Sequence, residues 1–122
     1  STVGGTVGKW IRQALQVLQQ MGYDISKIDP KAIAIIIRNE SGGNPNAINN
    51  LDSNASNGTP SKGLMQTIGP TFNQWAASGH KNIYNPVDHI VAGVRHAINR
   101  CGSVSNVPGV EAVRNGHSYV GY

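Results

Sequence analysis

An apolar segment that ends in a single carboxylate constrains this chain more than any other feature. Residues 30–39 read Pro-Lys-Ala-Ile-Ala-Ile-Ile-Ile-Arg-Asn, and Asp29 stands before them. Asp followed by Pro is a typical helix start, because Asp caps the first turn and Pro fits the first helical position. Apolar residues almost all round this helix predict the buried central helix of a small globule. Glu40 follows, and the next five residues, Ser-Gly-Gly-Asn-Pro, end the helix.

Glu40 is therefore a candidate catalytic acid. A carboxyl group at the end of an apolar helix, facing a polar loop, loses solvation of its charged form, so its pKa rises and it keeps a proton near neutral pH. Such a group can protonate a leaving oxygen. The alternative is a structural Glu that accepts hydrogen bonds from loop amides, and position alone fits both equally well.

The length of 122 residues allows one hydrophobic core but not two. We expect a linker remnant at residues 1–5 and a single domain at residues 6–122. Helical periodicity with Pro, Asp or Asn at the starts and Gly at the ends predicts a mostly α fold of about five to six helices. At most a small irregular β element is expected between Ser41 and Gln66. The expected helices cover residues 7–21, 30–40, 70–78, 86–101 and 108–115.

Composition excludes several classes of partner. Ten Lys and Arg against six Asp and Glu give a net charge of +4, but the basic residues are scattered, so nucleic acid is not expected to bind. The longest apolar run stops at Arg38, well short of the ~18 residues that a membrane span needs. Cys101 is the only cysteine, and His89 and His96 lack a third ligand, so we expect no disulfide, metal or cofactor. Without an initial Met or a signal peptide, the sequence is expected to be an excised domain.

Three blocks of residues follow one another at fitting distances. They are Glu40-Ser41-Gly42-Gly43-Asn44-Pro45, then Gly63-Leu64-Met65-Gln66, then Ile83-Tyr84-Asn85-Pro86 with Ile90 and Gly93. Together they resemble the motifs of the soluble lytic transglycosylase (SLT) family, lysozyme-like enzymes that cleave peptidoglycan. The resemblance covers roughly residues 30–102, and it implies a lysozyme-like fold.

Residues 49–66 are similar to the version of these motifs in actinobacterial cell-wall enzymes and in the lytic domains of phage tail tape-measure proteins. The resemblance thus implies peptidoglycan glycan strands as the partner. We expect the isolated domain to be monomeric. We also expect it to act outside the cell at the wall, or from a phage virion tail.

The resemblance implies a mechanism in which one carboxylate acts twice. Glu40 would protonate the glycosidic oxygen between N-acetylmuramic acid and N-acetylglucosamine, and would then act as base toward the C6 hydroxyl of the muramoyl residue. That hydroxyl attacks within the substrate and leaves a 1,6-anhydro product. Because the nucleophile belongs to the substrate, one carboxylate suffices where ordinary glycosidases need two.

The resemblance also implies substrate-binding positions. Ser41 would support Glu40 or the substrate, and Met65 would contact the apolar face of a sugar. Gln66 would hydrogen-bond to hydroxyl or acetamido groups, and Gly63 would let the backbone approach the glycan closely. The full set of expected substrate-binding residues is Ser41, Asp52, Ser61, Gly63, Met65, Gln66, Tyr84 and Tyr119.

Two departures from the family pattern affect the site. The usual final block, an Ala-Tyr-Asn-Ala-Gly run that supplies a Tyr beside the acid, is absent. Tyr119 is the best replacement for that Tyr, and Tyr122 is the second. His89 stands where the family commonly has Asn, which affects a local hydrogen bond and not the chemistry.

Asp52 separates two possible reactions. If it lies across the cleft from Glu40, hydrolysis through a nucleophile or an activated water becomes possible, as in a muramidase. Alternatively Asp52 caps a turn in the Asn-rich loop, which the turn preference of Asp favours. A non-catalytic glycan-binding module is the third interpretation, and the intact Glu40 argues against it.

Overall fold

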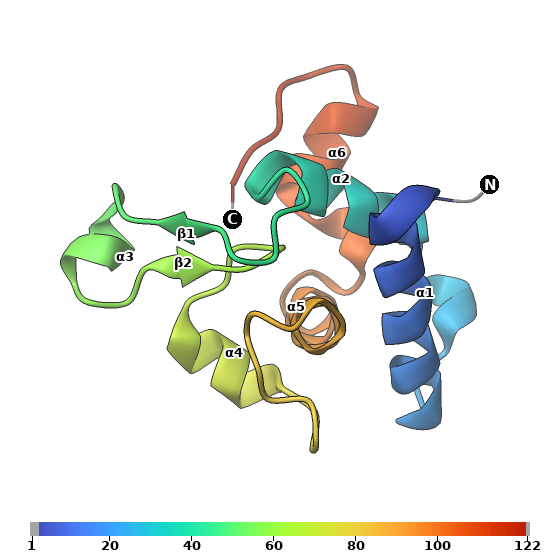
Figure 1. The fold of residues 1–122 in the computed structure, drawn as a ribbon. Helices are drawn as coiled ribbons and strands as arrows, with labels where there is room; N and C mark the ends of the chain where they lie inside the picture. Colours follow the sequence, from blue (N-terminus) through green and yellow to red (C-terminus); the bar gives the residue numbers. More distant parts are fainter. Residues whose placement is uncertain (1–2, 122) are drawn as a thin grey trace.

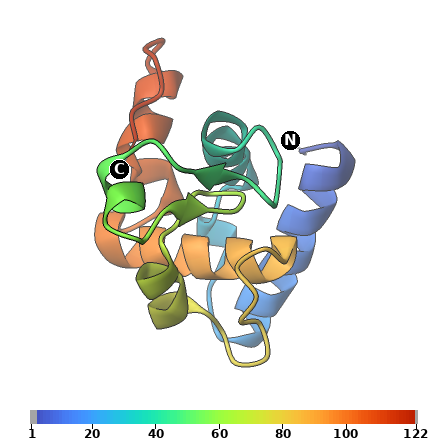
Figure 2. The same ribbon diagram turned by 60° about the vertical axis from the view of Figure 1, so that its left-hand side comes forward.

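Helix α5, Pro86–Cys101, makes the two most extensive helix–helix contacts of the fold (Figure 1). The computed structural model describes residues 3–121. In this range α1, Gly5–Gln20, and α4, Gly69–Trp75, both lie against α5, which Figure 2 shows from the side. Helix α2, Pro30–Glu40, packs on α1 and on α6, Pro108–Arg114. The mostly α, single-domain fold expected from the sequence is thereby confirmed.

Shorter elements connect these helices. The 3₁₀ helices η1, Ile25–Lys27, and η2, Val104–Asn106, lie between α1 and α2 and between α5 and α6. Strands β1, Ile48–Asn49, and β2, Ser61–Lys62, pair antiparallel on either side of α3, Ser53–Ser56. This hairpin is the small β element that the sequence predicts between residues 41 and 66.

The apolar helix α2 is buried as predicted. Ile33, Ile36 and Ile37 are at most 1% exposed, and they share one core with α1 and α5. Each fully buried Ile stabilises the fold by about 1.5–3 kcal/mol relative to an exposed one. Because this helix is fixed along its whole length, the residue at its last position, Glu40, is held in a defined place.

Local sequence signals predicted the ends of most helices, but not the end of α4. We expected the helix that starts at Pro70 to run to residue 78, just before Gly79, but α4 ends at Trp75, and Ala76 is extended with φ −62° and ψ 138°. The Trp75 carbonyl accepts a hydrogen bond from the Arg95 guanidinium of α5, so a tertiary contact ends the helix early. Gly79 instead belongs to the turn between the bridged residues Ala77 and His80.

Val3 and helix α1 pack against the same core. Helix α1 begins at Gly5, and the half-buried Val3 before it packs against the core. The first two residues of the expected linker remnant lie outside the described residues. Within residues 3–121, no helix is both long and apolar enough to cross a bilayer.

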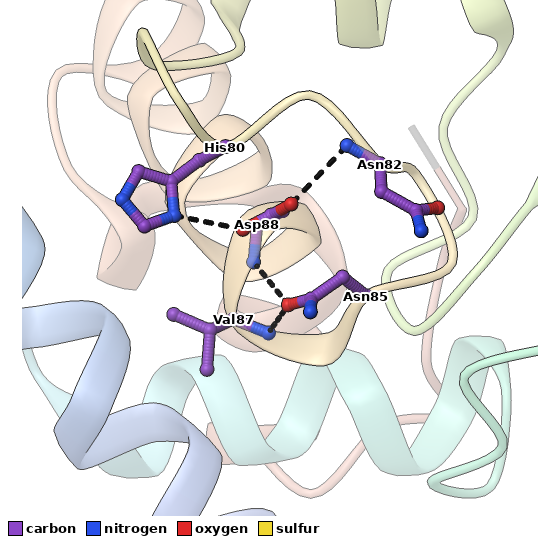
Figure 3. Close-up of polar contacts among 5 residues, drawn as sticks. All are labelled: His80, Asn82, Asn85, Val87 and Asp88. Atoms are coloured by element: carbon purple, nitrogen blue, oxygen red, sulfur yellow. Dashed lines mark hydrogen bonds and ion pairs between the residues drawn. The ribbon is translucent and has the colours of Figure 1, made fainter.

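The start of α5 is held by a cluster of polar side chains (Figure 3). Asn85 Oδ1 accepts hydrogen bonds from the backbone N–H groups of Val87 at 3.0 Å and Asp88 at 3.1 Å. The Asp88 carboxylate accepts from the Asn82 N–H at 3.2 Å and lies 2.8 Å from His80 Nδ1. These bonds tie the loop of residues 80–85 to the helix and fix where α5 enters the core.

Asn85→Ala is expected to reduce the free energy of unfolding by about 1 kcal/mol, because two N–H groups of the first turn lose their acceptor. Urea unfolding followed by circular dichroism measures the change. Asn99→Ala, at an exposed position of the same helix, is the matched control and is expected to leave stability within ~0.5 kcal/mol. Equal losses in the two variants would contradict the capping role of Asn85.

Candidate active site

Glu40 faces a groove of about 750 Å³. The end of α2, the β1–β2 hairpin, α4, α5 and the C-terminal segment all contribute to its lining. Neutral amide and hydroxyl side chains predominate on its walls: Asn39, Asn49, Asn54, Ser61, Gln66 and Thr71. These groups both donate and accept hydrogen bonds, so the groove suits a ligand that is rich in hydroxyl and amide groups.

The Glu40 carboxyl is half-buried at the last position of α2. Burial raises the pKa of Glu40 above its usual value, and a hydrogen bond from the Tyr119 hydroxyl acts in the opposite direction. The negative end of the α2 dipole also disfavours the carboxylate, which adds to the effect of burial. A carboxyl group in this setting keeps its proton at a higher pH than an ordinary Glu and can donate it into the groove.

Tyr119 reaches Glu40 from the segment that follows α6. Its hydroxyl donates to Glu40 Oε2 at 2.7 Å, across a separation of 79 residues in the chain. A donor at this atom stabilises the carboxylate that remains after Glu40 gives up its proton. Gly121 of the same segment lines the groove, and Tyr122 lies outside the described residues.

Met65 and Gln66 line the same groove as Glu40. Met65 is only 3% exposed, belongs to the core cluster and packs against Gly93 of α5, so it contributes little surface to the groove. Gln66 has φ 57°, a conformation that costs a non-glycine residue about 1–3 kcal/mol and that clusters at functional sites. Its amide nitrogen donates to the carbonyls of Ala47 at 3.2 Å and Gly63 at 2.9 Å, so a ligand would meet its amide oxygen.

His89 holds this wall in place. Its Nε2 accepts a hydrogen bond from the Met65 N–H at 3.0 Å, and its Nδ1 lies 3.0 Å from the Ile83 carbonyl oxygen. Since Nε2 accepts, Nδ1 carries the proton and donates to Ile83. Burial lowers the pKa of His89 to about 4, against a weaker opposing effect of the Ile83 bond, so the ring is neutral at pH 7. The imidazole thus joins α5 to two loops and replaces the local hydrogen bond that the sequence left in doubt.

Gly63 has a different role from the one expected. It is buried at φ 78°, and a side chain there would overlap the His89 ring and come within 2.9 Å of the Ile83 carbonyl oxygen. The residue thus allows close packing of the second block on α5. Gly63 is not among the described residues that line the groove, so close approach of a glycan does not explain why this residue is a glycine.

The remaining predicted residues divide between the groove and its surroundings. Ser61 lines the groove. Ser41 lines an adjoining shallow depression, and its Oγ donates to the Ile37 carbonyl at 3.1 Å and accepts from the Gly43 N–H at 3.2 Å, which closes the end of α2. Tyr84 stands outside both, with the Lys62 ammonium 5.9 Å from its ring centre. The structure therefore does not bring Tyr84 to Glu40.

Asp52 lies in the same groove as Glu40, but its carboxylate oxygens hold the local backbone together. Oδ1 accepts from the Ala55 N–H at 3.0 Å, and Oδ2 accepts from the Asn49 side-chain amide at 3.3 Å. The first bond caps α3, and the second ties α3 to β1. The geometry is that of the turn cap, which was the favoured alternative for Asp52.

Two groove residues on α5 were not predicted. His96 and Arg100 are four positions apart on one face of the helix, and both line the groove. Burial lowers the pKa of His96, and the nearby Arg100 charge adds to this effect. In the sequence His96 stands out only as a candidate metal ligand, whereas the spacing of His96 and Arg100 on the helix that follows the third block was the available signal. Over residues 3–121, no group of three or more His, Cys, Asp or Glu side chains could hold a metal ion.

Comparisons with known proteins agree with this architecture. A family model described as "Transglycosylase SLT domain" matches residues 18–113. The chain is also similar to the "Uncharacterized protein YqbO" of Bacillus subtilis (strain 168), with 42% identity over 120 residues. That alignment covers 98% of the chain and 7% of the Bacillus protein, so the chain spans a small part of its relative. No solved structure matches.

The buried His89 predicts a specific dependence of stability on pH. Its folded-state pKa of about 4 lies below the ordinary value of 6.5, so the unfolded chain binds more protons between these values and stability falls as the pH drops through that window. Between pH 7 and pH 4.5 we expect the chain to lose roughly 2–3 kcal/mol more stability than His89→Asn, which cannot take up this proton. Urea unfolding at the two pH values measures this difference.

The matched control is His117→Asn, at an exposed position. It should lose as much stability as the unchanged protein over the same pH range. If His89→Asn also loses as much stability as the unchanged protein, the assignment of His89 as a buried, neutral imidazole is wrong.

Proposed function

The chain belongs to the transglycosylase SLT domain family, and on that premise we propose that it cleaves peptidoglycan glycan strands as a lytic transglycosylase. One observation carries the proposal. The half-buried Glu40 carboxyl, with its raised pKa and its Tyr119 hydrogen bond, faces a groove lined by neutral hydrogen-bonding groups. This is the arrangement needed to protonate a glycosidic oxygen in a sugar polymer.

In the proposed reaction Glu40 first acts as an acid. Its proton passes to the oxygen that links N-acetylmuramic acid to N-acetylglucosamine, the bond from the muramoyl C1 to this oxygen breaks, and the leaving sugar keeps the proton. The Glu40 carboxylate then takes the proton of the muramoyl C6 hydroxyl, whose oxygen bonds to C1 and forms the 1,6-anhydro ring. Glu40 ends as it began, protonated, and no water is consumed. The Tyr119 hydroxyl stabilises the carboxylate between these two steps.

The alternative, hydrolysis by Glu40 with Asp52, rests on their presence in one groove. A glycosidase of that kind needs a second carboxylate that can attack the sugar or activate a water. Both Asp52 oxygens instead accept hydrogen bonds within the β1–α3 segment. That engagement favours the substrate's own hydroxyl as the nucleophile.

The other groove residues are proposed to bind the glycan. The Gln66 amide oxygen and the Ser61 hydroxyl offer partners to hydroxyl or acetamido groups, and the nearly buried Met65 supports the groove wall from below. We also propose that the isolated domain acts as a monomer. The polymer lies outside the cell membrane, so we propose that the domain reaches it at the cell wall, or as part of a phage virion tail.

Glu40→Gln is expected to abolish the loss of turbidity of purified peptidoglycan, with a rate at least ~10²–10⁴-fold lower, because the amide cannot donate or accept the transferred proton. Circular dichroism should show an intact fold. Glu111→Gln changes the other Glu of the chain, at an exposed position, and is expected to keep full activity. Substantial clearing by Glu40→Gln would rule out the proposed acid and would favour another mechanism.

Asp52→Asn separates the two reactions. Asn caps short helices about as well as Asp, so we expect α3 to persist and the clearing rate to stay within about five-fold of the unchanged protein. The same turbidity assay measures it. A loss as complete as that of Glu40→Gln would assign Asp52 a chemical role and would support the muramidase alternative.

A further inference from the structure

The segment that carries Tyr119 turns back sharply after α6. Gly116 has φ 81°, and the His117 N–H donates to the Ala112 carbonyl at 2.8 Å, which closes the end of the helix. Figure 1 shows this last segment, in red, leaving α6, turning back and running toward the end of α2. The Tyr119 hydroxyl then meets Glu40 Oε2. A short terminal segment thus supplies a group that acts on the acid.

Gly109, the second residue of α6, lies directly under this segment. It is buried, and a Cβ atom built there would overlap the Tyr119 ring and the Val120 carbonyl oxygen, with Tyr119 Cδ1 only 2.7 Å away. Its φ lies outside the positive range, so the backbone itself does not require glycine. In a helix, Ala is the more favourable residue at such a position. The contact with residues 119–120 is therefore the physical reason for a glycine here.

The helix cannot move away to make room for a side chain. Val107 and Val110, which flank Gly109, are fully buried, and α6 packs on α2 and η2. The C-terminal segment is the freer partner, since Val120 is 51% exposed. A methyl group at position 109 would therefore displace Tyr119 and Val120 rather than α6.

We propose that Gly109 is a positioning residue: the absence of a side chain there seats residues 119–120 on α6 and so places the Tyr119 hydroxyl on Glu40. The catalytic consequence rests on the proposed function, whereas the placement itself does not. A change at Gly109 would affect the pKa of Glu40 only through the position of the Tyr119 hydroxyl. A change at Gly109 should therefore reproduce the effect on Glu40 of losing the Tyr119 hydroxyl.

The test compares Gly109→Ala, Tyr119→Phe and the double variant. A ¹³C NMR titration of the Glu40 side-chain carboxyl reads the placement directly. Removing the hydroxyl takes away a bond that favours the carboxylate, so Tyr119→Phe should raise the pKa of Glu40. We expect Gly109→Ala to raise it by a similar amount, and the double variant to raise it no further than Tyr119→Phe alone.

Activity and stability give two further readouts. Clearing of peptidoglycan should fall about ten-fold in both single variants, and no further in the double variant. The falling side of the pH–rate profile should move to higher pH, because Glu40 must be protonated to act as the acid. The melting temperature of Gly109→Ala should fall no further than that of Tyr119→Ala, because both variants lose the packing of the Tyr119 ring on the core and Ala at position 109 favours the helix.

Gly4→Ala is the matched control. Gly4, the N-cap of α1, has φ −91°, and a Cβ atom there would meet nothing within 4 Å. It should leave the titration of Glu40 and the activity unchanged.

Three results would overturn the proposal. They are an unshifted Glu40 titration in Gly109→Ala, an additive shift in the double variant, and a Gly109→Ala protein that melts well below Tyr119→Ala. Full activity of Glu40→Gln would instead refute the proposed function, and the titration would still decide the role of Gly109.

Discussion

The desolvation of one carboxyl group is the constraint on which the rest of this structure depends. Glu40 is carried to the edge of the core by a helix whose isoleucines are almost completely buried, so it cannot retreat into solvent without disturbing that core. Burial and the negative end of the helix dipole both favour its protonated form. The hydroxyl of Tyr119 opposes them by favouring the charged form. A group balanced in this way can both release and take up a proton, as a reaction with two proton transfers demands.

The part of the groove formed by Met65 and Gln66 depends on a second buried polar group. His89 is 1% exposed and connects α5 with the Met65 N–H and the Ile83 carbonyl, and Phe72 stacks on it with ring centres 6.0 Å apart. A neutral imidazole satisfies one donor and one acceptor at once, which a buried charge could not do at comparable cost. The wall that carries Met65 and Gln66 is thus anchored to the same helix, α5, that contributes His96 and Arg100 to the groove.

Patterns of neighbouring residues in the sequence were enough to predict most of the fold. Asp29 before Pro30 and Asn85 before Pro86 predicted two helix starts, and in both cases the side chain accepts hydrogen bonds from the first turn. The order of the three motif blocks predicted the family. The end of α4 could not be read in this way, because it depends on a hydrogen bond from Arg95, 20 residues away.

The same limit explains what the sequence left out of the site. Gly63 was assigned to the glycan because a glycine permits close approach, but the group that approaches it is His89 of α5. His96 and Arg100 carry no motif of their own and reach the groove only because α5 passes beneath it. The packing of the C-terminal segment on Gly109 likewise brings together residues that no local sequence pattern connects. Such contacts follow from packing between elements, and a pattern along one element does not contain them.

The mass of the glycan ends that the protein releases from purified peptidoglycan tests the central claim most directly. If Glu40 acts alone and the muramoyl C6 hydroxyl is the nucleophile, mass spectrometry will find 1,6-anhydro ends, each one water lighter than a hydrolysed end. Muramoyl ends at the full hydrolysed mass would show that water was the nucleophile. That result would contradict the account of a single carboxyl group acting in turn as acid and base.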